Sequence, residues 1–164
     1  MLFSQTNGII PLCEVGATAS GNVELRSFNM AGYDQACVIL HFASTYITVS
    51  AATLTVETGS AGSDDLADAT FHYRWNSASS ATSASSDVYG TDATASTLSL
   101  GTGGTYAGKV LLLEINGDEL PTASKAYNWV TVDIGANASI GTLAAYAILS
   151  NPRYAKAVMP TAVS

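Results

Sequence analysis

Two histidines are the first residues to consider, because histidine is a common general base and metal ligand near neutral pH. His41 and His72 both fall in apolar, strand-like runs, and each has an aromatic neighbour. Neither histidine has sequence neighbours that suggest a catalytic triad, and no serine or cysteine stands in a nucleophile-elbow pattern such as G-x-S-x-G. A single histidine on a strand is more often a structural hydrogen-bonding residue than a base. The sequence context of the two histidines therefore gives no indication of hydrolase activity.

Carboxylates and thiols are the remaining candidates for chemistry. Asp64, Asp65 and Asp68 form a small acidic cluster, but their spacing does not match an EF-hand calcium loop. Acids in the first turn of a short helix would explain them as well. Cys13 and Cys37 lack metal-ligand spacing, so we expect free thiols, while a bridge between the two stays possible. We expect no enzyme activity, no metal and no cofactor.

The stretch "FHYRW" places three aromatic side chains on one face of a strand: Phe71, Tyr73 and Trp75. A row of rings on a β-sandwich can bind sugars, because pyranose faces stack on aromatic planes. Tyr73 and Trp75 are therefore a candidate carbohydrate platform. The same alternation is also what a half-buried strand shows when its aromatic residues belong to the core.

Composition excludes two classes of partner. The 164 residues carry only six Lys and Arg and a net charge of −7, whereas phosphate binding needs clustered cations. We therefore expect no nucleic acid partner. No apolar run reaches the ~20 residues of a membrane helix, and no secretory signal is visible, so we expect a protein made in the cytoplasm that has no membrane contact. Charged residues make up only 12%, which suits a member of an assembly.

The elements that would position these residues are β-strands. Short runs rich in Val, Ile, Thr and Leu alternate with Gly, Ser, Asn and Asp clusters. The run "KVLLLEI" is apolar on both faces, which indicates a central strand. The pattern predicts an all-β antiparallel sandwich, jelly-roll-like, with a barrel as the alternative. The eight expected strands span residues 22–28, 35–42, 52–58, 69–75, 96–100, 108–115, 127–134 and 142–149.

The chain reads as one domain with an extension at each end. We expect an extended N-terminal arm over residues 1–20, a sandwich over 21–152 and a C-terminal tail over 153–164. The Ser/Ala-rich segment 76–107 lies between strong strand signals. It is therefore interpreted as a long surface excursion of one sandwich and not as a linker between two domains.

The second half of the chain resembles small structural proteins of tailed bacteriophages, specifically the head decoration (capsid cement) class. The resemblance covers residues 108–155 and rests on strand patterns and an Arg-Tyr pair. The quoted elements are "VLLLEI" at 110–115, "DEL" at 118–120, "YNWVTV" at 127–132, "AAYAIL" at 144–149, and Pro152-Arg153-Tyr154.

This resemblance implies a β-rich protein, commonly a trimer, that sits on the exterior of a capsid in the virion and bridges subunits non-covalently. The expected partners are the major capsid protein and further copies of the chain. Candidate contact residues lie in the two terminal segments: Leu2, Phe3, Ile9, Ile10, Arg153, Tyr154, Val158 and Met159. For Arg153, an ion pair within the chain is an equally good interpretation.

Two other functions remain open from the sequence. The first is a carbohydrate-binding sandwich of a tail fibre or surface protein, which would use Tyr73 and Trp75. The second is a capsid shell or tail-tube subunit.

Overall fold

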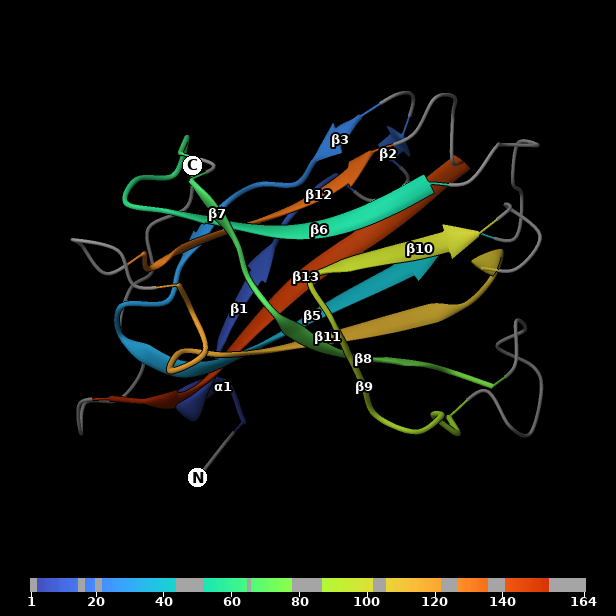
Figure 1. Cartoon of the computed structure of the whole chain (residues 1–164). Helices are drawn as coiled ribbons and strands as arrows, with labels where there is room; N and C mark the ends of the chain where they lie inside the picture. Colours follow the sequence, from blue (N-terminus) through green and yellow to red (C-terminus); the bar gives the residue numbers. More distant parts are fainter. Residues whose placement is uncertain are drawn as a thin grey trace.

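The structure is a computed structural model of the whole chain. It describes residues 3–14, 17–19, 22–43, 52–64, 66–77, 87–101, 106–121, 127–135 and 141–153. Within these ranges the protein is almost entirely β-structure (Figure 1). The elements are α1 (Phe3–Thr6), β1 (Gly8–Pro11), β2 (Ala17–Ala19), β3 (Val23–Glu24), β4 (Phe28–Asn29), β5 (Tyr33–Phe42), β6 (Ala52–Gly59), β7 (Ala67–Asp68), β8 (Phe71–Trp75), β9 (Ala93–Ala95), β10 (Thr97–Gly101), β11 (Val110–Asn116), β12 (Trp129–Gly135) and β13 (Gly141–Pro152).

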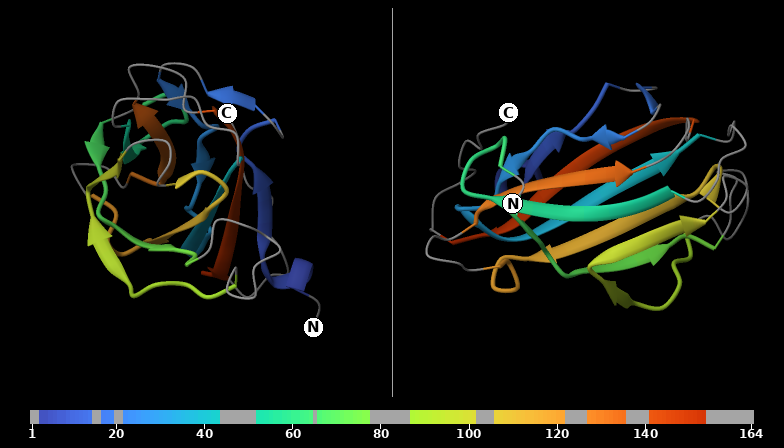
Figure 2. Two further views of the ribbon diagram at one scale, coloured as in Figure 1. Left: turned by 90° about the vertical axis from the view of Figure 1, so that its right-hand side faces the viewer. Right: turned by 45° about the horizontal axis from the view of Figure 1, so that its top comes forward.

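The strands form two antiparallel sheets that face each other (Figure 2). The large sheet has the order β1-β13-β5-β11-β8-β9, and β2 also pairs with β13. The small sheet has the order β10-β6-β12-β3, with β4 beside β12 and β7 beside β6. The predicted all-β sandwich is therefore confirmed.

Successive long strands cross from one sheet to the other. From β5 onward, β6, β10 and β12 belong to the small sheet, while β8, β11 and β13 belong to the large sheet. This alternation gives the sandwich its jelly-roll-like character. Each crossing brings segments that are distant in sequence together between the sheets, so one core serves the whole domain.

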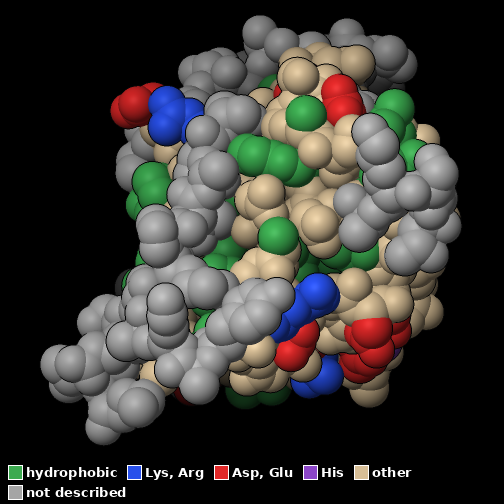
Figure 3. Space-filling model, turned by 90° about the vertical axis from the view of Figure 1, so that its left-hand side faces the viewer, with side chains coloured by type: hydrophobic (Ala, Val, Ile, Leu, Met, Phe, Trp, Pro, Cys, Tyr) green, Lys and Arg blue, Asp and Glu red, His purple; other side chains and the backbone are tan. Residues whose placement is uncertain are grey.

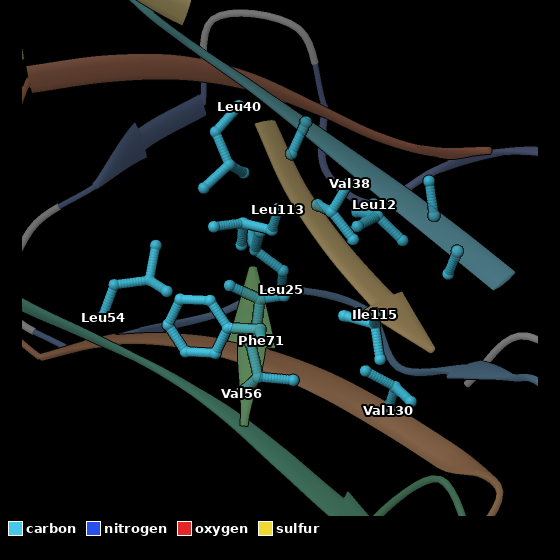
Figure 4. Close-up of a cluster of buried hydrophobic side chains, with 14 of the residues drawn as sticks. Leu12, Leu25, Val38, Leu40, Leu54, Val56, Phe71, Leu113, Ile115 and Val130 are labelled. Atoms are coloured by element: carbon cyan, nitrogen blue, oxygen red, sulfur yellow. The ribbon is translucent and has the colours of Figure 1, made fainter. Parts of the chain in front are cut away.

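The core follows from the period-2 pattern of the strands. Leu54 and Val56 of β6 are fully buried, whereas Thr53 on the same strand is exposed. Strand β11 lies between β5 and β8, as expected for the central strand, and buries Leu111 and Leu113. Figure 4 shows side chains from both sheets meeting in this cluster. Complete burial of a Leu or Val side chain contributes roughly 1.5–3 kcal/mol.

Several expectations about local elements need correction. The strand expected over residues 22–28 is divided into β3 and β4, and Leu25 is buried between them. Among the described residues of the acidic stretch, residues 60–64 form a turn and Ala67–Asp68 form β7, so the short helix considered there is not observed in that part of the chain. The hydroxyl of Thr58 donates to the carbonyl of Ala67 at 2.7 Å and fixes this pairing. The expectation of free thiols, by contrast, is confirmed: Cys13 and Cys37 form no disulfide with each other.

The Ser/Ala-rich segment contributes to the fold where the structure describes it. Strand β9 pairs with β8, and β10 pairs with β6. Tyr89 forms a bridge with Asn76 just beyond the end of β8. The rest of the excursion, residues 78–86 and 102–105, lies outside the described residues.

Candidate partner-binding face

The outward side of the large sheet carries side chains in rows that cross its strands. We call this surface the outer face. Its inward counterparts, such as Val38 and Leu113, are fully buried in the core. Strand register gives one outward row of Ile9, Ile148, Cys37, Glu114 and His72. The neighbouring row is Pro11, Tyr146, Ile39, Leu112 and Arg74.

In both rows the side chains change from apolar at the β1 edge to charged or titratable towards β8. Over β1, β13 and β5 the side chains are apolar, and Leu112 extends this apolar half onto β11. Ile9 is 54% exposed, while Ile148, Tyr146 and Ile39 are half-buried. Helix α1 lies against β1 and β13 and presents Phe3, which is 57% exposed. Apolar surface therefore extends from the N-terminal segment to the middle of the large sheet.

The outward side of the small sheet differs in chemistry. Over β6 and β10 it presents hydroxyl groups from Thr53, Thr55, Thr97 and Ser99. These side chains hydrogen-bond with water and lose little by staying exposed. The two faces are therefore unequal over these strands. The small sheet also has apolar side chains near its border, Leu66 (55% exposed) beside β6 and the half-buried Trp129 on β12, but the outer face of the large sheet carries the longer apolar rows.

A hollow lies at the end of the outer face, where β5 begins and β11 and β13 end. It has a volume of about 310 Å³ and is lined by Gln35, Ala36, Cys37, His72, Glu114, Ile115, Asn116 and Ser150. A second hollow of about 330 Å³ shares Gln35 and Asn116 and continues to Asp34, Asp118 and Arg153. Figure 3 looks onto this end of the sandwich, where acidic and basic side chains lie next to one another along the lower border.

His72 belongs to a charged cluster beside the hollow. Its Nδ1 lies 2.8 Å from Oδ2 of Asp92, and its Nε2 lies 3.7 Å from Oε1 of Glu119. The Nε of Arg74 lies 3.7 Å from the other Asp92 oxygen. The hydrogen bond to Asp92 raises the pKa of His72 above its usual value, and the same bond lowers the pKa of Asp92.

The cluster does not activate the nearest thiol. Glu114 separates Cys37 from His72 in their row, which places the two residues two strand spacings, roughly 10 Å, apart. Burial raises the pKa of Cys37 to about 11. The thiol is therefore protonated at neutral pH and is a poor nucleophile.

Arg153 is paired within its own chain. Its Nε donates to Oδ1 of Asp34 at 2.7 Å, and its backbone N–H donates to the carbonyl of Gly32 at 3.0 Å. Of the two interpretations left open by the sequence, the structure shows the intrachain ion pair. The candidate contacts Leu2, Tyr154, Val158 and Met159 lie outside the described residues.

The predicted partner-contact residues of the N-terminal segment lie partly on the surface and partly in the core. The segment over residues 8–11 forms strand β1, which extends the large sheet next to β13. Ile10 is only 6% exposed and fills the domain's own core, so it does not lie on a surface that a partner reaches. Phe3 and Ile9 are exposed and remain candidate contacts.

The aromatic row of β8 packs inward. Tyr73 and Trp75 are half-buried against the hydrophobic core. The ring of Trp75 lies 5.9 Å from that of Phe42, and the ring of Tyr73 lies 6.4 Å from that of Phe71. This packing is that of core aromatics, which weakens the argument for an exposed sugar platform.

The sequence analysis noted that "KVLLLEI" is apolar on both faces, but it named no outer-face residues of the central strands as candidate contacts. Their signal was available in "AYAIL" and "VLLL", where apolar residues occupy both faces of a strand. A run of this kind predicts that the second face is also covered; the outward residues of these strands are half-buried, and helix α1 lies against β1 and β13.

Comparisons with other proteins assign no family. No protein-family profile matches the sequence, no curated protein aligns with it significantly, and no solved structure shows a significant match. Over the part of the chain that the structure describes, no helix is long and apolar enough to cross a membrane. Within the same residues no group of three or more His, Cys, Asp or Glu is placed to hold a metal ion.

Proposed function

We propose that this chain is a structural protein of a virus particle, a decoration protein that binds the exterior of a phage capsid and stabilises it by bridging capsid subunits. The observation that carries the proposal is the apolar half of the outer face, where Ile9, Ile148 and Ile39 lie on neighbouring strands. Burial of such a surface against a partner is favourable by roughly 25 cal/mol for each Å² of apolar area.

Apolar surface of this kind suits attachment better than catalysis. Large contiguous apolar patches on soluble domains mark interaction sites, because they gain free energy when a partner covers them. On a capsid, each copy repeats the same weak contact in a symmetric array. Many such contacts add through multivalency without any covalent bond.

The partner under this proposal is the major capsid protein, and the chain associates with further copies of itself, as a trimer. The resemblance over residues 108–155 supports this partner and this oligomeric state. A capsid shell or tail-tube subunit differs in one measurable way, because such subunits polymerise on their own. Size-exclusion chromatography of the purified chain distinguishes a small discrete oligomer from a growing assembly.

The direct experiment adds the purified chain to capsids assembled without it. We expect cosedimentation with the capsids at a saturating ratio, together with greater resistance of the particles to heat. Absence of binding would refute the proposal. A variant that ends at Arg153 tests the terminal segment: we expect an unchanged thermal unfolding midpoint and weaker capsid binding, whereas unfolding of the truncated chain would show that residues 154–164 serve the fold.

A further inference from the structure

Two carboxylates at the end of the outer face form no recorded ion pair with a described Lys, Arg or His. Glu114 points outward from β11 at the border of the apolar half and is exposed. Asp118 follows in the turn after β11 and lines the adjoining hollow. Neither pairs with a Lys, Arg or His within the described residues, whereas Asp34 and Asp92 each have a cation beside them.

The neighbouring polar groups leave acceptors available beside Glu114. The amide nitrogen of Asn116 donates to Oε2 of Glu119 at 3.0 Å, which engages the donor end of that side chain. Asn116 and Ser150 line the same hollow as Glu114, and each of these two side chains carries an oxygen that can accept a hydrogen bond. A group rich in donors, such as a guanidinium or an ammonium, satisfies this set of acceptors best.

We infer that the outer face docks a partner protein whose apolar surface has a Lys or Arg side chain at its border, and that this side chain enters the hollow beside Glu114. Cys37 and Ile148 connect the hollow to the apolar half, because they share the strand row of Glu114. One partner surface can therefore cover both regions. The apolar contact provides affinity, and the ion pair fixes the register and selects the partner.

A second copy of this chain fits the same surface poorly. The chain carries a net charge of −7, with only six Lys and Arg. Of the four described cations, Arg153 is held by Asp34 and Arg74 faces Asp92, while Arg26 and Lys109 form no recorded ion pair with a described residue. Two copies meeting through their outer faces would bring acidic borders together, which costs free energy when the charges are desolvated.

This inference names the chemistry of the partner and rests on the proposed function, so its first test uses no capsid. Isotope-labelled full-length chain is titrated with N-acetyl-arginine amide and, separately, with the neutral isostere N-acetyl-citrulline amide. We expect backbone shifts at Gln35, Glu114 and Asn116 with the arginine compound only. In Glu114→Gln we expect this binding to weaken by about tenfold or more. Equal shifts with both compounds, or no effect of Glu114→Gln, would overturn the inference.

The second test uses capsids and distinguishes failure of the cation-site inference from failure of the proposed decoration function. If the wild-type chain decorates capsids, Glu114→Gln should bind about tenfold more weakly, and the matched variant Glu24→Gln on the edge of the small sheet should bind normally. Decoration that is equal in all three chains overturns the inference and leaves the function standing. Absence of decoration by the wild type, with arginine binding intact, refutes the function and leaves the cation site standing.

The third test asks whether a second copy of this chain, and not a different protein, occupies the outer face. Sedimentation velocity compares the wild type with Leu112→Asp, which places a charge in the apolar half. We expect the same oligomeric state for both chains, because the inferred occupant is a different protein. If Leu112→Asp dissociates a wild-type oligomer while remaining folded, a second copy occupies the face and the inference fails.

Discussion

Arg153 is bound to Asp34: its Nε donates a 2.7 Å hydrogen bond to Oδ1 and joins the end of β13 to the beginning of β5. The pair lies beside the turn that follows β11, because the N–H of Gly117 donates to the carbonyl of Asp34 at 2.7 Å. Arg153 therefore lies where the end of β13, the beginning of β5 and the turn after β11 meet. This arrangement gives Arg153 a role in the domain itself.

Removal of the Arg153 side chain should have a small effect on stability. The side chains of Arg153 and Asp34 are 35% and 58% exposed, so water screens their attraction. We expect Arg153→Ala to lower the free energy of unfolding by about 0.2–1 kcal/mol, as measured by urea denaturation. A loss of several kcal/mol would show that Arg153 is part of the core structure.

Gly117 should depend on Arg153. A Cβ at this position would lie 2.5 Å from Nη2 of Arg153 and 3.2 Å from the carbonyl oxygen of Asp34. We expect Gly117→Ala to destabilise the wild type by displacing the guanidinium. In the Arg153→Ala background the same change should cost less, and a double-mutant cycle in urea measures this coupling. Additive effects would mean that the backbone of Asp34, and not the guanidinium, limits the position.

His72 should make stability depend on pH. Its pKa is raised in the folded state, so its contribution is complete below the unfolded value of about 6.5 and is lost as pH rises through the folded pKa. The pKa of Asp92 is lowered, so its contribution exists above its unfolded value of about 3.9 and is lost as pH falls through the folded pKa. The ion pair is therefore most stabilising in mildly acidic solution.

The measurement compares urea denaturation of the wild type and His72→Gln at about pH 5.5 and about pH 8.5. The wild-type advantage should shrink at the higher pH. Asp92→Asn should reduce the same pH dependence, leaving the smaller contribution of Glu119, and NMR titration of the imidazole should then give a lower pKa for His72. An identical advantage at both pH values would contradict the assigned pair.

The two sides of β11 should respond differently to truncation. Leu113 is fully buried between the sheets, and Leu113→Ala should lower the free energy of unfolding by about 2–5 kcal/mol. Leu112 lies half-buried on the outer face, so Leu112→Ala should cost clearly less. Chemical denaturation of both variants provides the comparison. Equal losses would show that the outer face is already covered within the domain, which would remove the basis for a partner there.

Periodicity predicted most of the long strands. In β6, Leu54 and Val56 alternate with threonines, and this alternation identifies both the strand and its buried side. The short strands β1, β2, β7 and β9 span only two to four residues each, too few to establish a pattern. They form because a longer neighbouring strand offers them an edge.

The candidate site could not be read from sequence for a related reason. The row that joins Ile148, Cys37 and Glu114 depends on the register of three strands that are distant in the chain. The Arg153–Asp34 pair spans 119 positions of sequence. Composition identified apolar strands and acidic turns separately, and only the sheet order places them on one surface.

The most direct test of the account is capsid cosedimentation of Ile9→Asp and Thr53→Asp, which add the same charge to opposite faces. Both wild-type residues are exposed, so neither change should prevent folding, and circular dichroism verifies this. The account predicts that Ile9→Asp loses capsid binding and that Thr53→Asp binds like the wild type. Retained binding by Ile9→Asp together with loss by Thr53→Asp would contradict it and would assign the partner to the small sheet.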